Sequence, residues 1–211
     1  MDIIQAIIVI LIGYLFGCFQ TSYFISRKFG KQDIREIGSG NAGASNVTSE
    51  MGWKFGILTG ISDVFKAFIP VKLVVLIFPA SFFQQIELMA LAGTGAILGH
   101  IYPFFMNFRG GKGIACYIGL LLAINWQLGI AVIISLILIT VITNYISIGS
   151  IFLYSIIPVL AYSSGDYSII VIQCAIVLFI VGIIKHWINI QRIVDGTETG
   201  FWSVYKKNKT K

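Results

Sequence analysis

The sequence predicts an all-α polytopic membrane protein with seven transmembrane helices. Three observations carry this prediction. Only 11% of the 211 residues are charged, whereas soluble domains average about 25%. Hydrophobic residues make up 57% of the chain, and the mean hydropathy is +0.88. The apolar residues also gather in segments near the ~20 residues that a membrane helix requires.

Seven apolar segments are the expected spans, and two of them are short. They cover residues 3–25, 55–78, 84–105, 113–125, 127–146, 148–163 and 167–184. The fourth and sixth are the short ones. The first has an acid and no basic region before its apolar run, so we interpret it as a membrane helix and not a signal peptide. Apart from residues 26–54 the connections are short, which predicts a single domain over residues 1–211.

Basic residues sort into alternate connections. The three basic regions contain Arg27, Lys28, Lys31, Arg35 and Lys54, then Arg109 and Lys112, then Lys185, Arg192, Lys206, Lys207, Lys209 and Lys211. The connections around 79–83, 125–127 and 163–166 contain none. Because cytoplasmic loops are enriched in Lys and Arg, this pattern places the N-terminus outside and the C-terminus in the cytoplasm. The net charge of +6 is then mostly a topology signal, and we expect no nucleic acid partner.

Isolated polar groups also stand inside the apolar segments. Cys18, Cys116 and Cys174 are odd in number and far apart, so they predict neither a disulfide framework nor a metal cluster. Asp63 and Lys66 lie three residues apart in the second span. Unpaired charges are costly there, so we expect them to pair with each other or with another helix.

The first unusual segment is "GSGNAGASNVTSEMG", residues 38–52. Glycine permits backbone geometries that turn several N–H groups toward one point, and such nests bind anions. Ser39, Asn41, Ser45 and Asn46 add neutral hydrogen-bonding groups. Clusters of Ser, Gly and Asn are also typical of ordinary flexible loops, and for this segment alone the loop is favoured.

The second segment is "NFRGGKGIACY", residues 107–117. It does not meet the P-loop pattern G-x-x-x-x-G-K-[ST], because Gly113 follows Lys112. A glycine-rich turn with a cation at the start of a helix nevertheless suits a phosphate. A positive-inside anchor would explain Arg109 and Lys112 but does not need Gly110, Gly111 and Gly113. The glycines therefore favour a phosphate site.

The third segment is "IIKHWINIQRIVDGTETG", residues 183–200. His186, Asn189 and Arg192 recur at i, i+3 and i+6, so they share one face if the last helix continues through them. His100, at the inner end of the third span, lies at a similar depth. Two histidines without nearby carboxylates make a poor metal site, so we expect a hydrogen-bonding or phosphate-facing role and no metal. An interfacial position beside Trp187 is the alternative for His186.

Together the motifs resemble the bacterial acyl-phosphate:glycerol-3-phosphate acyltransferase family, whose members are small seven-span membrane enzymes. "GSGNAGASN" resembles the family pattern S-G-N-x-G-A-T-N, and "DVFKAFIP" resembles D-x-x-K-G-x-x-P. "GHIYPFFMNFRGGKGIAC" is very close to G-H-x-x-P-x-x-x-x-F-K-G-G-K-G-x-A-T. "KHWINIQRIVDGTE" resembles R-H-x-x-N-I-x-R-L-x-x-G-x-E. The likeness covers essentially the whole chain, in order.

The resemblance implies a reaction and its setting. A fatty acyl phosphate would give its chain to the 1-hydroxyl of glycerol 3-phosphate, yielding lysophosphatidic acid and phosphate. This is the first step of phospholipid synthesis, and it needs no cofactor. The expected partners are acyl phosphate, glycerol 3-phosphate and membrane lipid. The expected location is the bacterial inner membrane.

The resemblance also implies residue roles. Ser39, Lys112, His186 and Asn189 are the expected catalytic residues. Lys112 would bind phosphate with the N–H groups of Gly110 to Gly113, and His186 and Asn189 would orient glycerol phosphate. The expected substrate-binding residues are Gly40, Asn41, Gly43, Ser45, Asn46, His100, Arg109, Gly110, Gly111, Gly113, Ser147, Ser150 and Arg192. A phosphate oxygen of the donor would take the hydroxyl proton.

The sequence departs from the family pattern at several positions. Ser49 stands where the family has an arginine expected to hold glycerol phosphate, and Lys185, Trp187 and Gln191 differ in the third motif. A divergent or non-catalytic paralogue is therefore one alternative. A carrier of a small phosphorylated solute is another. The clustering of polar groups on one membrane face disfavours the carrier, because carrier sites lie near the bilayer midplane.

Overall fold

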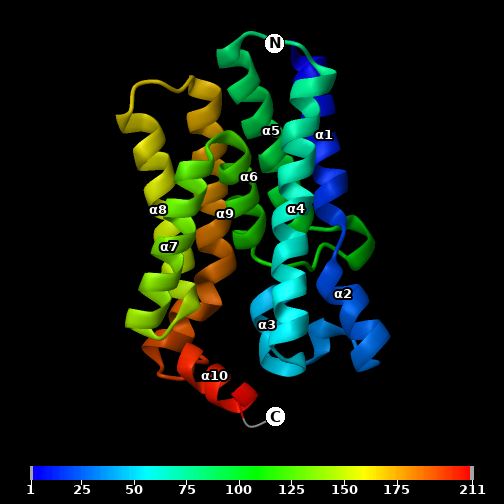
Figure 1. Ribbon diagram of the computed structural model, residues 1–211, viewed down its shortest axis with the longest axis vertical. Helices are drawn as coiled ribbons and strands as arrows, with labels where there is room; N and C mark the ends of the chain where they lie inside the picture. Colours follow the sequence, from blue (N-terminus) through cyan, green and yellow to red (C-terminus); the bar gives the residue numbers. More distant parts are fainter. Residues whose placement is uncertain (1, 210–211) are drawn as a thin grey trace.

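The computed structural model describes residues 2–209, and over that range the regular structure is helical. The helices are α1 (Ile3–Cys18), α2 (Thr21–Ile25), η1 (Ser26–Gly30), η2 (Ile34–Glu36), α3 (Ala44–Met51), α4 (Trp53–Ile77), α5 (Phe82–Ile101), η3 (Phe104–Met106), α6 (Ile114–Ile124), α7 (Trp126–Thr143), α8 (Ile146–Ser163), α9 (Ile169–Val194) and α10 (Phe201–Lys209). Figure 1 shows α1 and α4 to α9 running side by side as a bundle, with the chain termini at opposite ends.

Each of the seven predicted spans corresponds to one of these bundle helices. Five segments are long and apolar enough to cross a membrane, namely Ile3–Gly30, Phe82–Met106, Trp126–Thr143, Ile146–Ser163 and Ile169–Val194. Helix α4 has 25 residues but carries several charged side chains, and α6 has only 11 residues. The fourth span was expected to be short, and α6 is short. The sixth was also expected to be short, but α8 has 18 residues and is long enough to cross a membrane.

The first span is not one continuous helix, which corrects the predicted segment 3–25. The helix stops at Cys18 and resumes as α2, so backbone groups near Phe19 lose their helical partners. Lys66 donates to the Phe19 carbonyl at 2.6 Å, and the Gln20 side chain donates to the His100 carbonyl at 3.0 Å. The ammonium nitrogen of Lys66 also lies 2.8 Å from Asp63 Oδ1, which confirms the expected ion pair within the second span.

Small residues let α1 and α5 approach closely. A Cβ atom added at Gly17 would collide with the backbone of Ala96, and one added at Gly99 would collide with the carbonyl of Tyr14. Such small-residue contacts are a common way to pack membrane helices, because lipid supplies little hydrophobic drive between them. Helix α6 packs against α4, α5 and α7, and α9 packs against α5 and α8.

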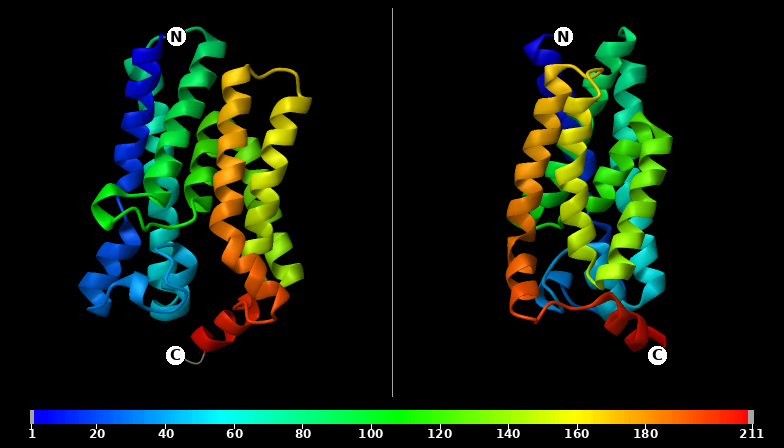
Figure 2. Two further views of the ribbon diagram at one scale, coloured as in Figure 1. Left: turned by 180° about the vertical axis from the view of Figure 1, so that it is seen from behind. Right: turned by 90° about the vertical axis from the view of Figure 1, so that its left-hand side faces the viewer.

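The short helices gather at the end of the bundle that holds the C-terminus. Figures 1 and 2 place α2, α3 and α10 there. The first turn of α10 is anchored to Asn144, because the Phe201 N–H donates to its carbonyl at 2.7 Å and the Trp202 N–H to its side chain at 2.9 Å. At the other end of α10, Asn208 donates to the Thr48 carbonyl of α3 at 3.2 Å. Helix α10 therefore reaches from the α7–α8 turn to α3.

Candidate functional site

The three motif segments meet around one cavity of about 480 Å³, which we call the motif cavity. Of the expected site residues, it is lined by Ser39, Asn41, Gly43, Ser45, Asn46, His100, Lys112, Gly113, Ser147, Ser150, His186, Asn189 and Arg192. These residues come from the segment before α3, from α3, α5, α8 and α9, and from the α5–α6 loop. The fold thus brings together most of what the sequence singled out.

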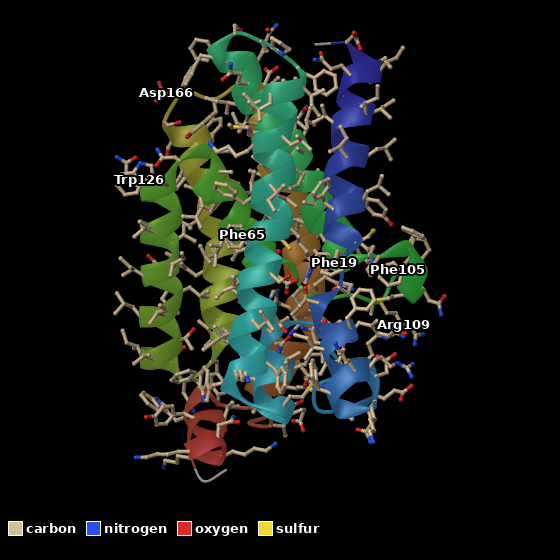
Figure 3. The ribbon with its side chains drawn as sticks, turned by 45° about the vertical axis from the view of Figure 1, so that its right-hand side comes forward. Phe19, Phe65, Phe105, Arg109, Trp126 and Asp166 are labelled. Carbon is tan, nitrogen blue, oxygen red and sulfur yellow. The ribbon has the colours of Figure 1, made fainter. Side chains whose placement is uncertain are left out.

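Four expected residues do not line the motif cavity: Gly40, Arg109, Gly110 and Gly111. Figure 3 shows Arg109 at the edge of the bundle below Phe105, and its side chain is exposed. The chain reaches it through Asn107 and Phe108, whose φ angles are 53° and 58°. Arg109 therefore lies outside the motif cavity although only two residues stand between it and Lys112, which lines the cavity.

The glycine-rich loop rests on the end of α5. The N–H of Gly110 donates to the Ile101 carbonyl, and the N–H of Gly111 donates to the His100 carbonyl, both at 3.1 Å. A Cβ atom at Gly111 would collide with the imidazole of His100. Gly113 then adopts a φ of +87°, which an L side chain rarely does, and begins α6. The N–H groups of Gly110 and Gly111 are already bonded within the protein and are not available to a phosphate. Of the loop residues expected to bind phosphate, this leaves Lys112 and Gly113.

Lys112 stands at one end of a polar network across the cavity wall. Its ammonium donates to the side-chain oxygen of Asn189. The Asn189 amide nitrogen donates to Glu198 Oε1 at 2.6 Å, and the Ser147 hydroxyl donates to the same oxygen at 3.1 Å. Glu198 therefore fixes which way the Asn189 amide faces. Sequence reasoning did not single out Glu198, although the last acid of "DGTE" was the available signal.

The surroundings of Lys112 set its charge. Burial lowers the pKa of Lys112 to about 8, because the charged ammonium loses hydration. Glu198 opposes this by raising the pKa, whereas the positive charges of Arg192 and Lys185 lower it. Lys112 is therefore mostly protonated at neutral pH and loses its proton as the pH rises through about 8.

The first motif is organised around the side chain of Asn46. Its amide nitrogen donates to the carbonyls of Ile34 and Ile37, both at 3.0 Å, and its oxygen accepts from the Ser39 N–H at 2.9 Å. A Cβ atom at Gly38 would collide with that same oxygen. The segment is thus a folded turn that leads into α3, and the favoured interpretation of residues 38–52 as a flexible loop is wrong. The bonds that Asn46 makes to residues seven to twelve positions earlier are what a composition argument cannot detect.

Residues 183–194 of the third segment lie on one continuous helix, which is the condition under which a shared face was expected. Helix α9 runs to Val194, so His186, Asn189 and Arg192 share the face that lines the cavity. His186 Nδ1 lies 2.8 Å from the carbonyl of Gly182. A carbonyl can only accept, so Nδ1 carries a proton, and Nε2 of the neutral ring is an acceptor.

A second cavity of about 500 Å³, which we call the apolar cavity, lies elsewhere in the bundle. It is lined by Ala90, Tyr117, Leu120, Leu121, Ile124, Asn125, Leu128, Ile157, Leu160, Ala161, Ser163, Ser164, Tyr167, Val171, Cys174, Ala175 and Leu178. Its wall is mostly aliphatic, and it shares no lining residue with the motif cavity.

Known proteins resemble the chain over nearly its whole length. A family model described as glycerol-3-phosphate acyltransferase matches residues 7–196. Glycerol-3-phosphate acyltransferase 1 of Oceanobacillus iheyensis is 34% identical over 204 residues, which cover 95% of this chain and 97% of the relative. Glycerol-3-phosphate acyltransferase of Photobacterium profundum is 36% identical over 212 residues, which cover 97% of this chain and 98% of the relative.

Solved structures give the same result for the fold. A crystal structure of PlsY, an integral membrane glycerol 3-phosphate acyltransferase, in its glycerol 3-phosphate form matches with a TM-score of 0.83 and 31% identity, over 93% of this chain and 95% of the other. The lysophosphatidic acid form matches with a TM-score of 0.80 and 30% identity, over 95% and 98%. The family match includes the first two motif segments and residues 183–196 of the third, which meet at the motif cavity. The chain therefore belongs to the glycerol-3-phosphate acyltransferase family.

Proposed function

We propose that this protein transfers a fatty acyl chain from an acyl phosphate to the 1-hydroxyl of glycerol 3-phosphate, giving lysophosphatidic acid and phosphate. The observation that carries the proposal is the meeting of the three motifs around one cavity, with the Lys112–Asn189–Glu198 network in its wall. Family membership supports the same activity, and the two PlsY structures are described with glycerol 3-phosphate and with lysophosphatidic acid.

The wall of the motif cavity suits both substrates. Each substrate carries a phosphate, and Lys112 and Arg192 supply positive charge to the cavity. Neutral donors come from Ser39, Asn41 and Ser45. The apolar part of the wall contains Ile114, Ala115, Ile118, Leu136 and Ile146. We assign this apolar part to the start of the acyl chain and the polar part to the phosphates and glycerol hydroxyls.

The reaction needs little chemistry from the protein, because an acyl phosphate is already activated. The 1-hydroxyl oxygen of the acceptor attacks the acyl carbon and forms the ester bond. The bond between the acyl carbon and the phosphate oxygen breaks, and its electron pair leaves with the phosphate. A phosphate oxygen takes the hydroxyl proton. Lys112 stabilises the negative charge that develops on the oxygens around the acyl carbon.

The remaining residues position these groups. We assign Ser39 to a hydrogen bond near the reacting atoms, and His186 and Asn189 to orienting glycerol 3-phosphate. The other lining residues Asn41, Gly43, Ser45, Asn46, His100, Gly113, Ser147, Ser150 and Arg192 form the rest of the binding wall. Gly40 and Arg109 lie outside that wall, as do Gly110 and Gly111, which support Lys112 from α5.

We place the protein in the bacterial inner membrane as one domain with seven spans. The α3 part of the motif cavity wall and the basic residues of η1 and α10 lie toward the bundle end that holds the C-terminus, as the positions of α2, α3 and α10 indicate (Figure 2). Positive charge favours the cytoplasmic side, which puts the C-terminus inside and the N-terminus outside. The acceptor is a cytoplasmic metabolite, and this orientation opens the site toward it.

A purified preparation in detergent tests the function. With palmitoyl phosphate as donor, phosphate should be released only when glycerol 3-phosphate is present, together with one lysophosphatidic acid per phosphate. A carrier would instead move glycerol 3-phosphate into proteoliposomes without forming product. A non-catalytic paralogue would do neither, and it would fail to complement a bacterial strain that lacks this acyltransferase.

A further inference from the structure

Tyr154 of α8 is buried behind the motif cavity and does not line it. Its side chain has no solvent exposure, and its ring stacks on Tyr117 with the ring centroids 5.1 Å apart. Its hydroxyl donates to the main-chain carbonyl of Lys112 at 2.8 Å. Tyr154 thus bonds the backbone of the residue whose ammonium faces the site, and no motif in the sequence drew attention to it.

Two glycines make room for this ring. A Cβ atom at Gly182 of α9 would collide with the ring of Tyr154, and a Cβ atom at Gly113 would lie 2.8 Å from its hydroxyl. Gly182 also provides the carbonyl that holds His186 Nδ1, and the rings of His186 and Tyr154 are 6.0 Å apart. Tyr154 therefore touches the supports of both Lys112 and His186.

We propose that Tyr154 is a positioning residue for acyl transfer, with its hydroxyl holding the Lys112 backbone and its ring holding α9 at His186. The proposal rests on the proposed function for the reaction that it serves. Lys112 has a long flexible side chain and is followed by Gly113, so the loop itself fixes the ammonium poorly. The hydrogen bond from Tyr154 to the Lys112 carbonyl restricts the backbone of the loop directly beside Gly113.

Helix α8 gives the proposal further support. Ser147, Ser150 and Tyr154 lie at i, i+3 and i+7, which places them along one helix face. The two serines line the motif cavity, and Ser147 bonds to Glu198. One rigid face therefore carries both cavity residues and the anchor of the glycine-rich loop, so the relative placement of Lys112 and Glu198 is set by α8.

Tyr117 provides a matched control. It is the stacking partner of Tyr154, it is 2% exposed, and within residues 2–209 its hydroxyl has no hydrogen-bond partner. Tyr154→Phe and Tyr117→Phe make the same chemical change in adjacent, equally buried rings. Only Tyr154→Phe breaks the bond to Lys112. A difference between the two variants therefore reports that bond and not the loss of a buried hydroxyl in general.

The test measures initial rates against palmitoyl phosphate and glycerol 3-phosphate. Tyr154→Phe should lower kcat by about 5- to 100-fold, the range for leaving a buried carbonyl unpaired. Tyr117→Phe should stay within about two-fold of the parent, since no bond is lost. In the pH–rate profile, the alkaline limb of Tyr154→Phe should also move to higher pH. A more mobile Lys112 regains hydration, which raises its pKa, and the neighbouring charged and titratable groups stay in place, namely Glu198, Arg192, Lys185 and His186.

Three outcomes would overturn the proposal. Equal rates for the two variants would do so, as would an unmoved alkaline limb. The unpaired carbonyl is itself expected to lower thermal stability, so a rate loss that disappears once the rate is expressed per folded protein would show a merely structural role. If the parent protein transfers no acyl chain, the proposed function fails separately. Thermal stabilisation by glycerol 3-phosphate then tests Tyr154: it should be reduced in Tyr154→Phe and kept in Tyr117→Phe, and equal stabilisation would overturn the proposal.

Discussion

The motif cavity and the apolar cavity have almost the same volume, about 480 and 500 Å³, but their walls are built from different parts of the sequence. The apolar cavity is lined largely by helix faces from α6, α8 and α9. The motif cavity takes its wall from helix ends and irregular turns as well as from helix faces. Volume alone would not distinguish the two. The polar groups that converge on the motif cavity do.

The difference has a physical cause. Irregular backbone is tolerated at membrane depth only where it is buried in protein or lines a cavity, because lipid satisfies no hydrogen bonds. The loop from Gly110 to Gly113 meets this condition by bonding to the end of α5 and to Tyr154. Maintaining such a loop is a cost that a purely structural membrane bundle does not need. The comparison therefore predicts that substitutions act strongly in the motif cavity and weakly in the apolar one.

The largest effect is expected from Lys112→Ala. The change removes the ammonium that faces Asn189, and losing one such charge-stabilising donor typically lowers kcat by about 100- to 1000-fold. Phosphate release from palmitoyl phosphate measures it, with Lys54→Ala at an exposed position as the matched control. A Lys112→Ala protein that keeps near-normal turnover would remove the glycine-rich loop from the site.

Glu198→Gln should have the next largest effect. The variant keeps the shape of the side chain but loses the carboxylate that accepts from Asn189 and Ser147. Charge-assisted hydrogen bonds contribute about 1.5–3 kcal/mol, so the rate should fall by about 10- to 100-fold. The pKa of Lys112 should also fall further, since Glu198 raises it, and the alkaline limb should move to lower pH. A limb that stays in place would show that Glu198 does not act through Lys112.

The pH dependence of the parent protein comes next. Transfer requires protonated Lys112, so the rate should fall as pH rises through about 8 and reach roughly a ten-fold loss one pH unit higher.

The contribution of Lys112 to folding stability changes with pH in the opposite direction to the rate. The folded-state pKa of Lys112 lies below the ordinary value of 10.5, so the unfolded chain binds more protons between these values and this group contributes rising stability with pH. Between pH 6 and 10 the transfer rate should therefore fall without a matching fall in the melting temperature. A parallel loss of rate and melting temperature would point to unfolding instead.

Much of this architecture could be predicted because membrane helices are encoded locally. Apolar length and the spacing of basic residues indicated where the bundle helices lie, and the i, i+3 spacing of His186 and Asn189 indicated their common face. The break at Phe19 and Gln20 was missed, because the apolar pattern continues through it. What stabilises that break is Lys66 and the carbonyl of His100, which are distant in sequence.

The site was predictable to the extent that its residues belong to motifs. Arg109 was grouped with Lys112 by proximity in sequence, but its side chain is exposed at the edge of the bundle whereas Lys112 lines the motif cavity. Glu198 and Tyr154 were missed for the opposite reason. Tyr154 is not unusual within its own segment, and Glu198 is one acid of a turn. Each acquires a role through a partner tens of residues away, which is Lys112 for Tyr154 and Ser147 for Glu198.

A smaller effect is expected at Ser49, which lines the motif cavity. If an arginine there adds a hydrogen-bonding cation for the acceptor, Ser49→Arg should lower the KM for glycerol 3-phosphate by up to about ten-fold. The gain should shrink as salt rises, because part of it is electrostatic. Ser49 donates to Glu50 at 3.0 Å, so that carboxylate can capture the new side chain. Ser49→Ala is the control, and an unchanged KM at low salt would show that this chain holds its acceptor by other groups.

The smallest effect is expected from filling the apolar cavity, and a matched pair of substitutions makes the comparison direct. Ala161 lines the apolar cavity, and Ala115 lines the motif cavity at the first turn of α6. Leucine at either position adds the same volume and fits a helix, so any packing cost should be similar. Ala161→Leu should leave the transfer rate within about two-fold of the parent, because the added atoms enter a space that no substrate uses. Ala115→Leu should lower the rate by about five-fold or more, because the added atoms occupy space beside the acyl-chain wall. Initial rates at saturating glycerol 3-phosphate and varied palmitoyl phosphate separate the two, with thermal melts to compare folding. A rate loss in Ala161→Leu without loss of stability would mean that the apolar cavity takes part in turnover, and the contrast between the two cavities would no longer hold.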